Sequence, residues 1–265
     1  MEFAGIAAPL SGSCLDRLAT SLRTDLPSLW AVMTVETSGC GFLPDRRPKI
    51  LFERHKFSEL TNHRFDATHP DISNRTAGGY GEAGANQYVR LQAATALDRS
   101  AALRATSWGL GQVMGFNAAR AGYANVEDMV AAFTESEDRQ IAAMAEFIRT
   151  GQLDGALSAH HWAQFAERYN GANYSINDYD GKLARYYARY LTGPLPDLLV
   201  REVQMGLTLL ALPGVPSPGK VDGWYGEDTQ HALTAFQLAG QLPPTGRPDA
   251  PTMAELRKRL GWPTP

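Results

Sequence analysis

Glu36 is the acidic residue whose position in the sequence best fits a catalytic acid. It ends an apolar run that begins at Leu29, and Ser38-Gly39-Cys40-Gly41 follows almost at once. A carboxyl group held at the end of a buried helix is partly desolvated, which disfavours its charged form and raises its pKa. A raised pKa suits a general acid that works near neutral pH. An acid at a helix end can equally point into solvent without any chemical role, so position alone leaves both interpretations open.

Two later segments also carry side chains that can do chemistry. Residues 107–115 read Ser-Trp-Gly-Leu-Gly-Gln-Val-Met-Gly and contain a single amide side chain, that of Gln112. Residues 168–174 read Arg-Tyr-Asn-Gly-Ala-Asn-Tyr, which places Tyr169 and Asn170 at the end of an expected helix, before a tight turn. Structural roles are open for both, because Tyr169 could be a core residue and Asn170 a helix cap.

The elements that must position these residues are expected to be mostly helical. Pro27 suits the first turn of a helix that is apolar almost all round and therefore buried. Residues 49–53, Lys-Ile-Leu-Phe-Glu, are the one good strand candidate, and a short helix follows to Leu60. Ser136 is expected to cap a later helix. Residues 62–84 are irregular and rich in Gly, Asn and Asp, which is typical of the wall or lid of a binding cleft.

The chain is expected to divide near residue 192. Its 265 residues suggest one large domain or two unequal ones. Leu191-Thr-Gly-Pro-Leu-Pro-Asp197 breaks a helix and makes a short, stiff linker. Residues 1–192 hold 19 basic and 21 acidic residues and residues 193–265 hold 6 and 7, so neither part is expected to carry a charged patch. Apolar stripes in the second part predict a small bundle of three helices.

Composition and motifs argue against several classes of function. A net charge of −3 does not suit a nucleic-acid binder. No apolar run is long enough to span a membrane, and the N-terminus lacks the basic start of an export signal. Cys14 and Cys40 favour free thiols over a disulfide or a metal site. Adjacent His160 and His161, read inside a helix, would face different ways. Residues 79–84 match GxGxxG without a preceding strand, so we do not expect a dinucleotide cofactor. No cofactor and no metal are therefore expected.

Three segments in order, after Glu36, resemble the N-acetylmuramidase family of phage endolysins. They are Pro48-Lys-Ile-Leu-Phe-Glu-Arg-His55, the run 107–115, and Phe165-Ala-Glu-Arg-Tyr-Asn-Gly171. The likeness covers about residues 27–190. It implies a mainly α, lysozyme-like fold with a small β element. It also implies cleavage of the β-1,4 bond between N-acetylmuramic acid and N-acetylglucosamine, with Glu36 as general acid.

The second catalytic carboxylate stays open under this resemblance. Glu53 ends the strand candidate, where lysozyme-like folds build one wall of the cleft, and Arg54-His55 could orient it. Asp45 is another candidate, although Arg46-Arg47 make a solvated loop pair as good an interpretation. A mechanism without a second carboxylate is the third option. The separation decides the outcome, because an inverting enzyme needs roughly 6.5–9.5 Å and a retaining one about 5 Å.

The resemblance also implies residues that bind substrate. Gln112, Tyr169 and Asn170 match positions that contact substrate in the related families. Amides and aromatic rings suit an N-acetylated sugar, whose acetamido groups need hydrogen bonds and whose ring faces stack. Trp108 is expected to pack in the core rather than to hold a sugar.

The second part resembles the small three-helix peptidoglycan-binding domain. The likeness rests on Val203-Gln204, on Val221-Asp-Gly-Trp-Tyr-Gly226, and on Phe236-Gln237, with Phe236 expected in the core. The connection 212–219 is longer and richer in proline than the pattern usually has. Bacterial peptidoglycan is the implied partner.

Together, the two resemblances imply a modular enzyme. Residues 1–192 would form the catalytic domain, 193–197 the linker and 198–265 the peptidoglycan-binding domain. We expect a monomer, made in the bacterial host cytoplasm without a signal peptide and released to the periplasm through a holin-like pore. The first domain alone is expected to keep the chemistry but to bind the wall less well. A lytic transglycosylase on the same fold and a non-catalytic wall-binding virion protein are the alternatives.

Overall fold

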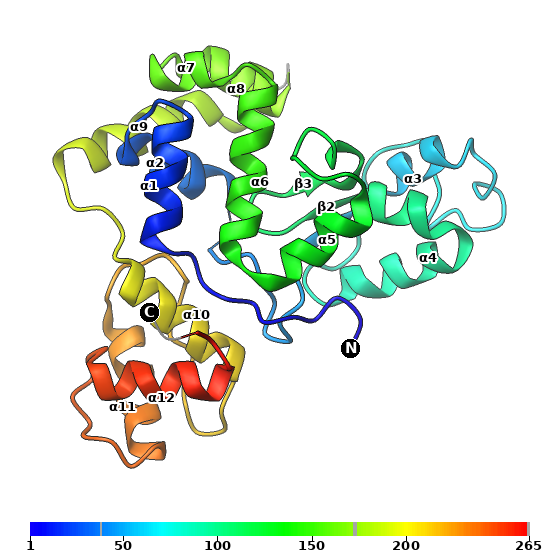
Figure 1. Ribbon diagram of the computed structural model, residues 1–265. Helices are drawn as coiled ribbons and strands as arrows, with labels where there is room; N and C mark the ends of the chain where they lie inside the picture. The colour runs from blue at the N-terminus through cyan, green and yellow to red at the C-terminus, as the bar shows by residue number, and fades with distance from the viewer. Residues whose placement is uncertain (38, 172–173, 264–265) are drawn as a thin grey trace.

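The computed structural model describes residues 1–37, 39–171 and 174–263. It is mainly helical with one small sheet, as the sequence predicts (Figure 1). The helices and strands in chain order are α1 (Gly12–Ser21), α2 (Leu26–Glu36), β1 (Ile50–Phe52), α3 (Arg54–Leu60), α4 (Asn86–Arg104), β2 (Thr106–Trp108), β3 (Val113–Met114), the 3-10 helix η1 (Gly115–Asn117), α5 (Val126–Glu135), α6 (Glu137–Thr150), α7 (Asp154–Ser158), α8 (Trp162–Asn170), the 3-10 helix η2 (Tyr174–Asn177), α9 (Tyr179–Thr192), α10 (Leu198–Leu210), α11 (Glu227–Ala239) and α12 (Ala250–Leu260). Across these residues, no helix combines the length and apolar character that a membrane span requires.

Helix α2 is buried in the N-terminal part, as its apolar sequence predicts. The Asp25 carboxylate caps the helix by accepting a hydrogen bond from the backbone N–H of Ser28 (2.8 Å), and Pro27 lies in the first turn. Helix α9 packs along α2, where the hydroxyl groups of Thr34 and Tyr190 lie 2.9 Å apart. The two helices together fix the direction in which the end of α2 points.

The sheet has the antiparallel order β1-β2-β3. Its first strand confirms the strand candidate, and Ile50 pairs with Trp108 across β1 and β2. Strands β2 and β3, of three and two residues, were not predicted from the sequence; β2 enters the run 107–115 from Thr106, and β3 lies within that run. Strands this short show no periodicity. Trp108 is fully buried and donates a hydrogen bond to the Leu103 carbonyl (3.0 Å), so its expected packing role is confirmed.

The connections and later helices agree with the sequence in most places. Helix α3 ends at Leu60, and residues 62–84 contain neither helix nor strand, both as predicted. Ser136 caps α6 as predicted, by accepting from the Arg139 N–H (3.2 Å). The 19-residue helix α4 was not predicted. Gln87, Leu91 and Ala94 are buried at helical spacing, but non-helical backbone at Asp98 interrupts the helix, and the next buried residues are 101–103.

The two histidines adjacent in sequence do not lie inside a helix, contrary to the sequence analysis. His160 and His161 form the turn between α7 and α8, and His160 has a positive φ of 56°. The chain reverses here, so the helical periodicity does not apply.

The C-terminal part contains the three expected helices α10, α11 and α12, with Phe236 fully buried between them. Its core is shared with the N-terminal part. Ala7, Cys40 and Phe42 are buried in the same cluster as the apolar side chains of α10 to α12. The indole N–H of Trp262 also donates to the Ile6 carbonyl (3.1 Å). Figure 1 shows α10 directly beside the N-terminal helices.

Candidate active site

Glu36 is the last residue of α2, and its partly buried carboxylate accepts a hydrogen bond from the Asn170 side-chain N–H (3.0 Å). Burial raises the pKa of Glu36 from its ordinary value of 4.5 to about 7. The Asn170 bond and the positive charge of Lys182 oppose this rise but are outweighed. The carboxyl group is therefore protonated up to neutral pH and can donate its proton there.

Aromatic residues of α8 and α9 surround this carboxylate. Burial, and secondarily the charge of Glu36, raises the pKa of both Tyr169 and Tyr179. Tyr169 stacks on Phe165, with ring centroids 5.4 Å apart. Tyr179 and Lys182 were not singled out from the sequence. Their spacing of three residues on one helix was the available signal, because such residues share a face.

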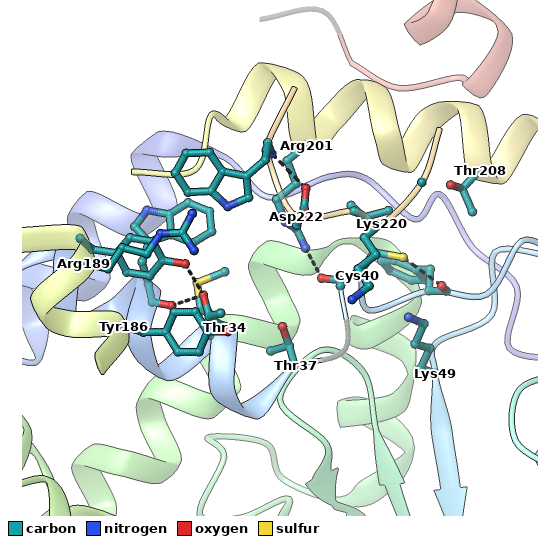
Figure 2. A pocket seen from close by; sticks show the side chains of 18 of the residues that line it. Thr34, Thr37, Cys40, Lys49, Tyr186, Arg189, Arg201, Thr208, Lys220 and Asp222 are labelled. Atoms are coloured by element: carbon teal, nitrogen blue, oxygen red, sulfur yellow. Dashed lines mark hydrogen bonds between the residues drawn. The ribbon is translucent and has the colours of Figure 1, made fainter. Parts of the chain in front are cut away.

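The loop that follows Glu36 is held from two sides. Thr37 is the C-cap residue of α2, and its N–H donates a hydrogen bond to the Met33 carbonyl. Ser38 lies outside the described residues. Gly39 has a φ of +95°, which favours glycine. Its carbonyl accepts a hydrogen bond from Arg201 of α10 (2.9 Å), marked in Figure 2. The N–H of the next glycine, Gly41, donates to a carboxylate at the start of α6 (2.8 Å).

That carboxylate is Glu137, and it forms an ion pair with Arg201 across the two parts of the chain. The Arg201 Nη2 and Glu137 Oε1 atoms are 2.9 Å apart, and a second bond joins Nη1 to Oε2. The two side chains are 3% and 0% exposed. Leu10 also donates its N–H to Glu137 (3.2 Å). The C-terminal part thus contacts the backbone three residues after Glu36.

The two candidates for a second carboxylate have different surroundings. Glu53 follows β1 and precedes α3, and its N–H donates to the Ala105 carbonyl (3.0 Å). Its carboxylate lies 3.3 Å from Nδ1 of His55, the neighbour expected to orient it. Asp45 instead forms a two-bond ion pair with Arg47 (2.6 and 2.9 Å). The ion pair with Arg47 thus engages the Asp45 carboxylate within its own loop.

Gln112 lies in the turn between β2 and β3, with a positive φ of 46°. Its amide accepts from the Ser107 hydroxyl (2.9 Å) and donates to the Gly109 carbonyl (2.8 Å). A weaker bond reaches the Lys49 carbonyl at the start of β1 (3.3 Å). The amide therefore braces the turn in this structure.

The structure brings Glu36, Tyr169 and Asn170 into one cluster. Gln112 and Glu53 lie apart from this cluster, in connections of the sheet. Gln112 contacts the start of β1, whereas Glu53 follows its end, roughly 13 Å further along at about 3.3 Å per residue. The second amide of the expected turn, Asn173, lies outside the described residues.

No acidic side chain contributes to the raised pKa of Glu36 in the part of the chain that the structure describes. A carboxylate about 5 Å away, as a retaining glycosidase requires, would raise this pKa by charge repulsion. The electrostatics therefore fit a more distant second carboxylate or a single catalytic acid.

Both cysteines are free and buried, and burial raises the pKa of Cys14 to about 12. Such a thiol stays protonated at neutral pH and is a poor nucleophile. Among the described residues, no group of three or more His, Cys, Asp and Glu side chains could hold a metal ion.

Comparison with known proteins points in one direction. Residues 25–191 match the family model described as N-acetylmuramidase, and residues 197–256 match the putative peptidoglycan binding domain. The crystal structure of the Burkholderia AP3 phage endolysin is similar to this chain at 41% sequence identity and a TM-score of 0.64. The match covers 69% of this chain and 70% of that one. No curated protein matches the chain.

Proposed function

The chain belongs to the N-acetylmuramidase family, and from this we propose that it hydrolyses the β-1,4 bond between N-acetylmuramic acid and N-acetylglucosamine, with Glu36 as general acid. At the coarser level it is a peptidoglycan hydrolase with a peptidoglycan-binding domain. The observation that carries the proposal is the buried Glu36 carboxyl, whose pKa is raised to about 7 beside the Asn170 amide.

In the proposed reaction Glu36 gives its proton to the glycosidic oxygen as the bond to the muramic acid C1 breaks. Asn170 and Lys182 favour the charged carboxylate, so they stabilise Glu36 after it has lost its proton. Water then adds to C1. Glu53, whose carboxylate lies 3.3 Å from His55 Nδ1, accepts the proton of that water as general base. Tyr169, Asn170 and Gln112 are proposed to contact the sugar chain.

The proposed organisation follows from the family matches and the helices. Residues 1–192 form the catalytic domain, 193–197 the linker and 198–265 the domain that holds the enzyme on peptidoglycan, with lysis of the bacterial wall as the result. The protein would act as a monomer on periplasmic peptidoglycan, after synthesis in the host cytoplasm and release through a holin-like pore. The endolysin at 41% identity supports this setting.

A lytic transglycosylase is the second candidate, because a single catalytic acid also fits the surroundings of Glu36. In that reaction the 6-hydroxyl of the muramic acid displaces the leaving sugar and gives a 1,6-anhydro end. Mass spectrometry of the muropeptides released from purified sacculi separates the two reactions. We expect products that have gained one water, and anhydro products would overturn the hydrolase proposal.

A non-catalytic wall-binding protein is the remaining alternative. It predicts that no muropeptide is released at all. Loss of release in Glu36→Gln, with folding intact, would exclude it.

A further inference from the structure

A cavity of about 610 Å³ lies between the two parts of the chain. Helices α2 and α9 form one side, and α10 with residues 219–224 forms the other (Figure 2). Its volume falls within the range of small-ligand sites, roughly 300–1,000 Å³. Glu36 is not among the described residues that line it, so the cavity is distinct from the proposed cleavage site.

Positive charge predominates on the cavity wall. Lys49 contributes from the N-terminal loop, Arg189 from α9 and Lys220 from the C-terminal part. Figure 2 shows Lys49 and Lys220 on the same side of the cavity, beside Cys40. Among the described lining residues, Asp222 is the single acid, and its carboxylate accepts the Trp224 N–H (3.0 Å) within the turn.

Among the described residues, Arg189 and Lys220 form no ion pair with an acidic side chain, in contrast to Arg201. Arg189 lies over the Trp224 ring at 4.8 Å, a contact that joins the two parts of the chain. The exposed side chain of Lys220 is directed to the cavity and solvent. The lining also includes the cation Arg201, which is already paired within the buried ion pair.

The remaining wall is largely apolar and aromatic. Its members are Trp30, Met33, Phe42, Tyr186 and Trp224. A suitable ligand therefore combines carboxylates, which bind cations, with small apolar groups, which pack against rings.

The cavity adjoins the proposed cleavage site through one turn of α2. Thr34 and Thr37 line the cavity and flank Glu36 on the same helix end. Thr37 follows Glu36 directly in the chain, and neighbouring Cα atoms are about 3.8 Å apart, so the cavity wall begins at the end of α2 that carries Glu36.

We propose that this cavity binds the peptide stems of peptidoglycan through their carboxylates, with Lys220 as a principal contact. The proposal rests on the proposed function, because the stems are attached to the muramic acid units of the same polymer. Stem carboxylates match the cations, and alanine methyl groups match the aromatic wall. The enzyme then prefers glycan that carries peptides over bare glycan.

The test measures binding, which does not depend on hydrolysis. Two ligands are prepared: intact sacculi, and the bare glycan strands that an amidase releases from them. The bare strands are coupled to beads, because removal of the stems dissolves the cross-linked wall, and they are called stripped sacculi below. The full-length protein, in a Glu36→Gln background that spares the polymer, is sedimented with each form. Lys220→Glu is compared with Lys258→Glu, which makes the same charge change at an exposed position of α12, outside the cavity. Lys220→Gln and Lys220→Arg complete the set.

On intact sacculi, we expect Lys220→Glu to weaken binding by at least about fivefold, while Lys258→Glu and Lys220→Arg stay within about twofold. On stripped sacculi, all variants should bind alike. Equal binding of the parent protein to both forms would overturn the proposal. So would an equal loss on stripped sacculi, or the same loss in Lys258→Glu. If the protein with Glu36 intact releases no muropeptides while these binding differences persist, the proposed function fails and the stem site stands.

Discussion

Arg201 of the C-terminal part and Glu137 of the N-terminal part form a buried ion pair that also holds the backbone after the proposed general acid. Both side chains are at most 3% exposed, and Arg201 donates in addition to the Gly39 carbonyl. The peptidoglycan-binding part is therefore bound into the structure of the catalytic part. A flexible attachment would make no such contacts.

Removing one member of this pair should destabilise the whole chain. Arg201→Met leaves the Glu137 carboxylate buried with only backbone donors, which costs about 3–5 kcal/mol in the free energy of unfolding. The matched control is Arg185→Met, which breaks the exposed Arg185–Asp178 ion pair. There we expect about 0–1 kcal/mol. Urea unfolding measures both, and similar losses would contradict the special role of the buried pair.

The shared core changes the expectation for residues 1–192 alone. Without the C-terminal helices, Cys40 and Phe42 lose their packing partners and Glu137 loses its cation. We now expect the truncated protein to melt at a lower temperature and to have little activity, rather than to keep its chemistry. Thermal denaturation and muropeptide release measure this. An unchanged melting temperature with full activity would restore the expectation drawn from the sequence.

Glu36→Gln should remove activity and change how stability depends on pH. Loss of a general acid lowers kcat by about 10²–10⁴. The native pKa of about 7 exceeds the ordinary value of 4.5, so native Glu36 holds its proton more tightly than the unfolded chain does. The free energy of unfolding of the parent protein therefore falls as pH rises from about 4.5 to 7 because of this group.

At pH 8 the Gln variant should be more stable than the parent by about 1–3 kcal/mol, and the gain should vanish near pH 4. Denaturant unfolding at the two pH values gives both numbers. A gain that is the same at pH 4 and pH 8 would show that the carboxyl group is not the cause.

Asn170 should influence the pH above which activity is lost, because it lowers the pKa of Glu36. Its hydrogen bond lowers the pKa of Glu36, so Asn170→Ala raises that pKa further and moves the alkaline limb of kcat/KM up by about half to one pH unit. Lys182→Met should move the limb in the same direction. Asn177→Ala, at an exposed position of η2, is the control and should leave the limb in place.

The two candidate bases can be separated by substitution. Glu53→Gln should lower kcat by about 10²–10³ with KM little changed, because it removes the group that activates water. Asp45→Asn should affect stability slightly and kcat hardly at all, since Asp45 is engaged by Arg47. If both variants retain full kcat, a mechanism with Glu36 alone is favoured.

The sequence predicted those features of the fold that depend on residues close together in the chain. The buried helix α2, its cap region at Pro27, and the acid at its end are all written in one short segment. The Asn170–Glu36 bond spans 134 residues, so its geometry had no local signal. Only the resemblance to a known family placed Asn170 at the site.

Charge counting along each part could not reveal the cations of the cavity for a similar reason. Each part of the chain is nearly neutral, which predicted no charged patch. The cavity takes Lys49 and Arg189 from one part and Lys220 from the other, so all three cations share a wall only when the two parts pack together. A count made separately along each part cannot reveal a cluster that neither part contains.

The core shared by Phe42 and the C-terminal helices also orders events during synthesis. The ribosome makes Glu36 and the whole catalytic part well before Leu260 and Trp262, which complete that core. Cys40 and Phe42, which follow Glu36, cannot acquire their final packing until these C-terminal residues have been made. The catalytic part therefore reaches its final packing only after the wall-binding part has been made, so folding of the wall-binding part is a step in the maturation of the catalytic part.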